Sequence, residues 1–180
     1  MIGKALALQL RTLLLSIEQL NHKIEQLFAQ LPGADLFAAL PGAGEHLAPR
    51  LLLAFGEERT RFSSAQDLMQ YAGIASVTKR SGEKDWVHWR WSCPKFLRQS
   101  FVEWAEQSRQ HSFWAKAFYE AQKRKGKTHQ EAIRALAFKW IRIIWRCWQD
   151  GKTYDQAKYL LALKQKRSPL VAQLALQTVS

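Results

Sequence analysis

The chain has 180 residues, 27 of them Lys or Arg and 15 Asp or Glu, so its formal net charge is +12. This excess favours polyanionic partners and is typical of proteins that bind nucleic acid. No apolar run approaches the roughly 20 residues that a spanning helix needs, and no apolar leader opens the chain, so we expect a cytoplasmic protein outside the membrane. Cys93 and Cys147 have no metal-ligand spacing, so we expect free thiols and no metal site.

The first 32 residues carry an apolar heptad pattern. Leu or Ile recurs at alternating spacings of four and three, at Leu6, Leu10, Leu13, Ile17, Leu20, Ile24, Leu27 and Leu31. This is the a/d seam of a coiled coil. We predict a coiled-coil connector helix over residues 1–32 that joins copies into a homo-oligomer through residues 6–31. An amphipathic helix folded back on its own domain would show the same pattern.

A glycine-rich turn, Leu40-Pro-Gly-Ala-Gly, follows between two apolar helical segments. Two glycines at this spacing let the backbone turn tightly and leave main-chain N–H groups open to a phosphate. We therefore predict a helix-hairpin-helix over residues 36–56 that contacts nucleic acid at Gly42 and Gly44. The alternative is a plain turn between packed helices, and Glu45 favours it because a carboxylate repels phosphate.

Helical periodicity fails between Gly73 and Trp91, and the run from Trp86 to Trp91 alternates as a short strand or hairpin arm does. We predict an irregular or β segment around residues 74–91 that carries a Ser-Gly loop. Ser81 and Gly82 lie there among cations, which are Lys79, Arg80, Lys84 and Arg90. Lys and Arg neutralise and orient phosphates. This segment is therefore the candidate for phosphodiester chemistry, although Ser-Gly is also a common turn pair.

The remaining residues predict a helical core over residues 94–165. Pro94 predicts a helix to about Gln110, Thr128 and Glu131 form a capping box for a helix up to Gly151, and Thr153 with Gln156 caps a last helix. We predict a mainly α fold with a flexible tail over residues 166–180. Four tryptophans at helical spacing predict core positions: Trp114, Trp140, Trp145 and Trp148.

Two further patterns admit a nucleic-acid function. Trp86, Trp89 and Trp91 interleave with charged residues, as in a groove that stacks bases, but burial of one hairpin edge explains the alternation equally well. Arg134, Arg142 and Arg146 share one face of the long helix. That stripe is a solvated face or a second phosphate track.

Five runs, in order and with compatible spacing, carry a family resemblance over roughly residues 36–160. They are Leu40-Pro-Gly-Ala-Gly, Tyr71-Ala-Gly-Ile-Ala-Ser-Val-Thr-Lys-Arg-Ser-Gly, Arg90-Trp-Ser-Cys-Pro-Lys-Phe-Leu-Arg98, Trp114-Ala and Ala132-Ile-Arg-Ala-Leu-Ala. This part of the chain resembles the C-terminal half of transposases of the insertion-sequence one-ten group, the bridge-RNA-guided recombinases.

The resemblance implies that Ser81 is a nucleophile that attacks a DNA phosphodiester and forms a phosphoserine link. It also implies DNA and a structured guide RNA as partners in the bacterial cytoplasm, at the nucleoid. We add Arg98 to the predicted nucleic-acid-binding residues, with Gly42, Gly44, Lys79, Arg80, Gly82, Lys84 and Arg90.

Transposases of this group begin with a RuvC-like domain whose four acidic residues bind divalent metal, whereas this sequence starts at the heptad helix. The acidic residues in the matched region, such as Glu83, Asp85, Glu103 and Glu106, have no spacing that rebuilds a metal cluster. We therefore expect no cofactor in this chain, a divalent metal only in the missing acidic domain, and no activity from the isolated chain.

Two classes of function follow from the sequence. The first is a transposase domain in which Ser81 cleaves and joins DNA strands when it is partnered. The second is a truncated, non-catalytic module that binds nucleic acid and dimerises. A membrane-surface protein is a distant third class.

Overall fold

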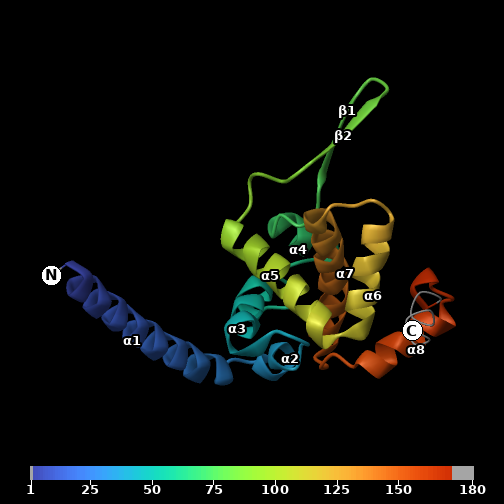
Figure 1. Ribbon diagram of the computed structural model, residues 1–180. Coiled ribbons are helices and arrows are strands. Elements are labelled where there is room, and N and C mark those ends of the chain that lie inside the picture. Colours follow the sequence, from blue (N-terminus) through green and yellow to red (C-terminus); the bar gives the residue numbers. More distant parts are fainter. Residues whose placement is uncertain (1, 172–180) are drawn as a thin grey trace.

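The computed structural model describes residues 2–171, and within residues 77–88 it leaves the side chains of Lys79, Lys84 and Asp85 undescribed. The chain is mainly helical, as predicted, with one two-stranded hairpin (Figure 1). The elements are α1 (Ile2–Ala29), α2 (Ala34–Ala38), α3 (Gly44–Phe55), α4 (Ala65–Tyr71), β1 (Val77–Ser81), β2 (Lys84–His88), α5 (Lys95–His111), α6 (Phe113–Arg124), α7 (His129–Asp150) and α8 (Gln156–Gln165).

Helix α7 is the centre of the body, where α4, α5 and α6 pack around it and α3 packs on α5. Trp104, Trp114 and Trp140 are fully buried at this centre. The Trp140 ring centroid lies 4.8 Å from that of Trp104 and 4.5 Å from that of Trp114. Trp140 Nε1 donates to the buried Ser108 hydroxyl at 2.8 Å, so this large core residue leaves no polar atom unsatisfied. The core prediction is confirmed for Trp114, Trp140 and Trp148, while Trp145 is only half-buried.

Helix ends follow the predicted capping signals with one exception. Thr128 and Glu131 form the capping box at the start of α7, and Gly151 ends that helix in the left-handed conformation. The cap of α8 is Asp155 instead of Thr153, because its carboxylate stands directly before the helix and accepts from the Lys158 N–H at 3.0 Å.

The capping box makes part of the stability depend on pH. Hydrogen bonds from the Thr128 backbone and side chain lower the pKa of Glu131 below its usual 4.5. A carboxyl whose pKa is lowered by folding stabilises the protein above the unfolded pKa, and this contribution disappears as pH falls through the folded value. Between pH 6 and 3 we therefore expect the wild type to lose more melting temperature than Glu131→Gln does. Glu57→Gln, which removes an exposed carboxylate outside the helices, should follow the wild type, and a parallel decline in all three would contradict the prediction.

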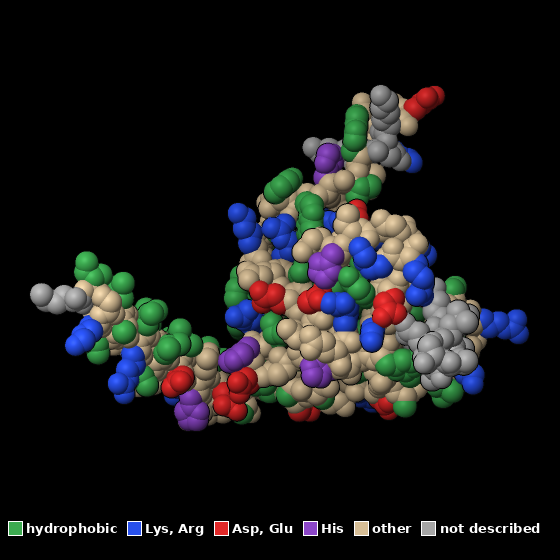
Figure 2. Space-filling model, viewed as in Figure 1, with side chains coloured by type: hydrophobic (Ala, Val, Ile, Leu, Met, Phe, Trp, Pro, Cys, Tyr) green, Lys and Arg blue, Asp and Glu red, His purple; other side chains and the backbone are tan. Residues whose placement is uncertain are grey.

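Helix α1 extends away from the body (Figure 1). Its apolar side chains face solvent (Figure 2). No α1 residue is buried, and Leu10 and Leu20 are 62% and 63% exposed. The helix ends at Ala29, three residues before the predicted end at residue 32. Of the two interpretations, the folded-back helix is not what the structure shows, and the coiled coil stays a prediction.

The segment after α8 docks on the body at least as far as Val171. Leu170 is 5% exposed and belongs to the core, although the sequence predicts a flexible tail from residue 166. The rest of that predicted tail, residues 172–180, lies outside the described residues. Across residues 2–171, none of the helices has both the length and the apolar character needed to cross a membrane.

Candidate nucleic-acid interface

A β-hairpin arm, residues 77–88, projects from the body and carries Ser81 at its tip (Figure 1). Strands β1 and β2 pair antiparallel, with Ser81 opposite Lys84 and Val77 opposite His88. Gly82 opens the two-residue turn with φ of 60°, the left-handed conformation that hairpin turns place at glycine. The predicted Ser-Gly loop is thus the turn of a hairpin.

The Ser81 side chain is exposed, and among the described residues no hydrogen bond engages its hydroxyl. Arg80 and Gly82 lie beside it at the tip, and both are exposed. The side chains of Lys79 and Lys84, which the sequence also predicts at this site, lie outside those described. The tip therefore offers a reachable hydroxyl to a partner but no enclosed pocket of its own.

Arg90 and Arg98 belong to a different place, the base of the arm. Ser81 is four residues from Val77, about 13 Å along an extended strand, so a phosphate at the tip lies beyond the reach of either guanidinium. Arg98 Nη1 donates to the Arg90 carbonyl at 3.2 Å. The structure thus separates the predicted cations into a tip group and a base group.

Trp89 anchors the base of the arm through two cations. The Arg134 guanidinium carbon lies 3.9 Å from the Trp89 ring centroid, and that of Arg98 lies 5.2 Å from it. Cation–π contacts of this kind hold the residue that follows β2 to α5 and α7. The neighbouring tryptophans are different, because Trp86 and Trp91 are 47% and 79% exposed. They remain available to a partner, whereas Trp89 is used within the chain.

Gly73 lets the residues after the arm approach the end of α4. Its φ is +71°, and a Cβ added there would overlap the Cys93 Sγ and lie 2.9 Å from the Cys93 Cβ. Cys93 itself is half-buried and unpaired. The glycine therefore sets the position of the irregular segment, residues 89–94, that leads from the arm into α5.

Gly73→Ala is expected to lower the free energy of unfolding by more than about 2 kcal/mol, because the left-handed backbone and the overlap with Cys93 both oppose an alanine. Gly33→Ala is the matched control. Gly33 also has positive φ, at +81°, but nothing lies within 4 Å of an added Cβ, so its loss should stay near about 1 kcal/mol. Urea unfolding followed by circular dichroism measures both. Equal losses would show that the contact with Cys93 contributes nothing.

The predicted helix-hairpin-helix corresponds to α2, a turn and α3. Gly42 has φ of +74°, and a Cβ there would lie 2.9 Å from the His111 side chain and 3.1 Å from the Gln107 backbone, so this side of the turn packs on α5. Gly44 is exposed at the start of α3 and has open space around it. Exposed Glu45 comes next in the helix. Close packing on α5 explains why a glycine stands at position 42, and phosphate contact at Gly44 stays a prediction.

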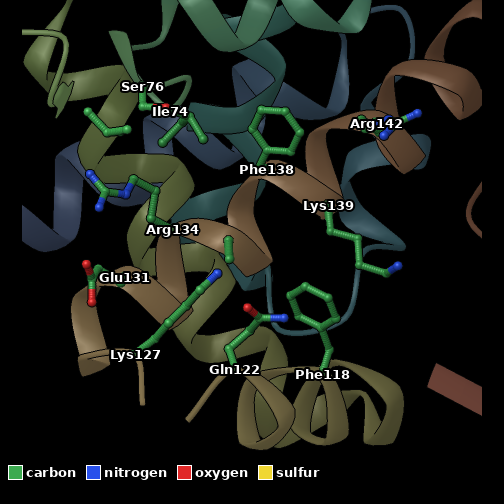
Figure 3. A pocket seen from close by; sticks show the side chains of 12 residues that line it. Ile74, Ser76, Phe118, Gln122, Lys127, Glu131, Arg134, Phe138, Lys139 and Arg142 are labelled. Carbon is green, nitrogen blue, oxygen red and sulfur yellow. The ribbon is translucent and has the colours of Figure 1, made fainter. Parts of the chain in front are cut away.

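A groove of about 490 Å³ lies at the base of the arm, between α6, α7, the residues just before β1 and the end of β2 (Figure 3). Four cations line it: Lys127, Arg134, Lys139 and Arg142. The third arginine of the predicted stripe, Arg146, lies elsewhere and pairs with Asp150 at 2.9 Å. Figure 2 shows Lys and Arg side chains on the body below the arm, with Asp and Glu side chains among them.

Sequence reasoning missed Lys127 and Lys139 as part of this groove. Lys139 stands five residues after Arg134 and three before Arg142, a spacing that places all three on one side of a helix. The contribution of Lys127 depends on how α6 turns into α7, and no local pattern shows that. Within residues 2–171, no group of three or more His, Cys, Asp or Glu side chains could hold a metal ion.

The sequence that forms this arm and its base is similar to that of a known protein family. Residues 34–120, from the start of α2 through the arm and into α6, match the model of the IS116/IS110/IS902 transposase family. Over this range the chain is similar to that transposase family, which supports the predicted resemblance.

Three relatives agree with the match. A mini-circle protein from Streptomyces coelicolor, described as a transposase for IS117, is 30% identical over 161 residues, which is 89% of this chain and 39% of the relative. The 43.6 kDa protein of insertion element IS110 from the same species is 29% identical over 76% of this chain and 34% of its own length. A pilin gene-inverting protein of Moraxella bovis is 32% identical over 78% of this chain and 46% of its own length. The chain thus spans less than half of each.

Proposed function

We propose that this chain, whose residues 34–120 match the model of a transposase family, takes part in DNA transposition or inversion by cutting and rejoining strands through Ser81. The observation that carries the proposal is the exposed Ser81 hydroxyl at the tip of a projecting arm within the matched domain. A nucleophile on an arm can reach a phosphate in a bulky duplex. A serine in a pocket of the body could not do so without opening the DNA further.

The chemistry is a phosphoryl transfer. Ser81 Oγ attacks the phosphorus of a phosphodiester, the new Oγ–P bond forms, and the P–O bond to the leaving sugar oxygen breaks. The serine proton passes to a base, and the leaving oxygen takes up a proton. Attack of another strand's hydroxyl on the phosphoserine reverses these changes and joins the strands, so no external energy source is needed.

This chain supplies cations for that step but not the base. Arg80, next to Ser81, is a candidate to stabilise charge on the phosphorane oxygens. A serine hydroxyl is a weak nucleophile at neutral pH and needs a base or a metal. The described residues do not fit a metal site, so the proposal assigns activation of Ser81 to an acidic domain, encoded in the same protein or in a partner.

Oligomerisation and nucleic-acid binding complete the proposal. The exposed apolar stripe of α1 supports pairing with a second copy through residues 6–31, since an isolated helix gains nothing from solvated leucines. The net charge of +12 supports binding to DNA, and the resemblance supports a structured guide RNA as a further ligand. A protein with these partners acts in the bacterial cytoplasm, at the nucleoid.

A second function, binding and dimerisation without catalysis, is favoured by one observation. Among the described residues, no carboxylate or imidazole is hydrogen-bonded to the Ser81 hydroxyl. If no acidic domain works with this chain, Ser81 is a turn residue and the module only binds.

Trapping a covalent adduct separates the two functions. The protein, expressed together with any acidic domain from its own locus, is incubated with Mg²⁺ and DNA of that locus and then digested with chymotrypsin. We expect a peptide spanning residues 72–86 that carries a nucleotide on Ser81. Strand joining with an adduct on another residue would overturn the assignment of Ser81, and binding without any adduct or joining would support the second function.

A further inference from the structure

The groove at the base of the arm has apolar walls as well as charge. Ile74, Val87, Phe118 and Phe138 line it together with the four cations, Lys127, Arg134, Lys139 and Arg142. In Figure 3, Phe138 lies near Ile74, while Phe118 rises from α6 beside Gln122. A site for phosphate alone needs only charge, so the aromatic walls call for a ligand with an apolar face.

Two of the cations are partly withdrawn from water. Burial lowers the pKa of the Lys139 amine, which Arg142 lowers further, and burial also lowers the pKa of Arg134. Within the described part of the chain, neither Lys139 nor Arg134 forms an ion pair with a carboxylate. Arg134 instead lies over the Trp89 ring and the Lys139 amine lies 5.1 Å from the Phe118 ring centroid, but a ring does not neutralise a cation. Partly desolvating a cation without a counter-ion is unfavourable in the free protein. An anionic ligand would remove that penalty.

Gln122 brings an unused amide to the same groove. The residue is 8% exposed, and its side chain points into the groove (Figure 3). No hydrogen bond to this amide is found among the described residues. The amide atoms are open to the groove and not enclosed in the core, and an amide offers both a donor and an acceptor. A donor next to an acceptor on the Gln122 amide is complementary to the hydrogen-bonding edge of a nucleobase.

We propose that the groove binds one unpaired nucleotide of a DNA strand, with its base against Phe118 and Phe138 and its edge at Gln122. The phosphates on either side of that nucleotide lie at Arg134 and at Lys139 with Arg142. The proposal rests on the proposed function, because it names the form in which the arm's substrate is held. It explains charge, aromatic walls and the free amide together, whereas a duplex backbone would use the charge alone.

The position of the groove fits a strand that continues to the arm. Val87 of β2 and Ser76, next to β1, belong to its wall, so a strand held there passes the base of the hairpin that carries Ser81. Glu131 also lines the groove, near Arg134. Its pKa is lowered by Thr128, so it stays ionised and disfavours phosphate on its own side. The phosphate site at Lys139 and Arg142, which lies away from Glu131, is therefore the stronger of the two, and the site at Arg134 is the weaker.

Binding of labelled oligothymidylate and of a duplex to the full chain, by fluorescence anisotropy, tests the proposal. The variant Lys139→Gln/Arg142→Gln should weaken oligothymidylate binding at least about tenfold and reduce the salt slope of log K by about 1.4. Gln122→Leu should weaken it about threefold with the salt slope unchanged. The control Lys116→Gln/Lys164→Gln, with the same charge change on exposed lysines outside the groove, should lose much less. Circular dichroism melts show that each variant is folded.

Photocross-linking to oligothymidylate that carries 5-iodouracil locates the base. We expect cross-linked peptides that contain Phe118 or Phe138. Cross-links confined to Trp86 and Trp91 would overturn the proposal, and so would equal losses in the groove and control variants. Tighter binding of oligouridylate than of oligothymidylate would make the strand RNA and overturn its assignment as DNA. If neither single strands nor duplexes bind, the proposed function fails as well.

Discussion

Ser81→Ala is expected to reduce DNA strand joining at least about a thousandfold while leaving the affinity for DNA within about twofold. The loss is large because the serine oxygen is itself the atom that bonds to phosphorus, and no neighbouring hydroxyl of the arm can replace it without moving the backbone. Affinity should persist because Ser81 is a small uncharged side chain at an exposed tip, and most affinity for DNA comes from cations. Strand joining is measured on DNA of the native locus, with the acidic domain supplied.

Thr78→Ala is the matched control for this prediction. Thr78 is also an exposed hydroxyl residue on β1, and it pairs with Val87 close to the base of the arm. It should keep strand joining within about threefold, since a surface substitution changes stability by less than about 0.5 kcal/mol. Joining that survives in Ser81→Ala, or that falls equally in Thr78→Ala, would contradict the role of Ser81 as nucleophile.

Sequence reasoning succeeded where the signal is local. The capping box at Thr128 and the left-handed stop at Gly151 were predictable because each depends on a few adjacent residues that satisfy helix ends. Burial of Trp114 and Trp140 followed from helical spacing on an apolar face. The hairpin was predictable as a β segment, because alternation and a Gly turn act within a dozen residues.

The rest depends on contacts between residues far apart in the chain. The sequence pattern predicts that the Gly42 backbone contacts phosphate, but in the structure Gly42 packs against Gln107 and His111 of α5. Arg90 is close to Ser81 in sequence, yet an extended hairpin carries the two apart. The groove requires Lys127, in the loop before α7, and Arg142, within α7, to line the same wall near the arm. None of these long-range contacts produces a periodic pattern in the sequence.

The heptad helix shows a third situation, in which the sequence pattern is clear but its partner is not. Leucines at a and d positions fit both an intramolecular and an intermolecular seam, because both bury the same stripe. The position of α1 away from the body removes the first option for this chain and leaves the stripe exposed. Under the proposed function, a second copy of the chain covers this stripe, and a measurement of the oligomeric state tests that.

Trp140→Ala is expected to lower the free energy of unfolding by about 3 to 5 kcal/mol, the range for truncating a large buried aromatic residue. Trp140 is fully buried among Trp104, Trp114 and Tyr154, so the cavity is surrounded by rigid rings that cannot collapse into it. Net stability of a domain is only about 5–15 kcal/mol, so the variant should melt at least about 6 °C lower. Trp91→Ala makes the same chemical change at a side chain that is 79% exposed, and it should stay within about 0.5 kcal/mol of the wild type. Similar losses in both variants would mean that Trp140 does not hold α5, α6 and α7 together.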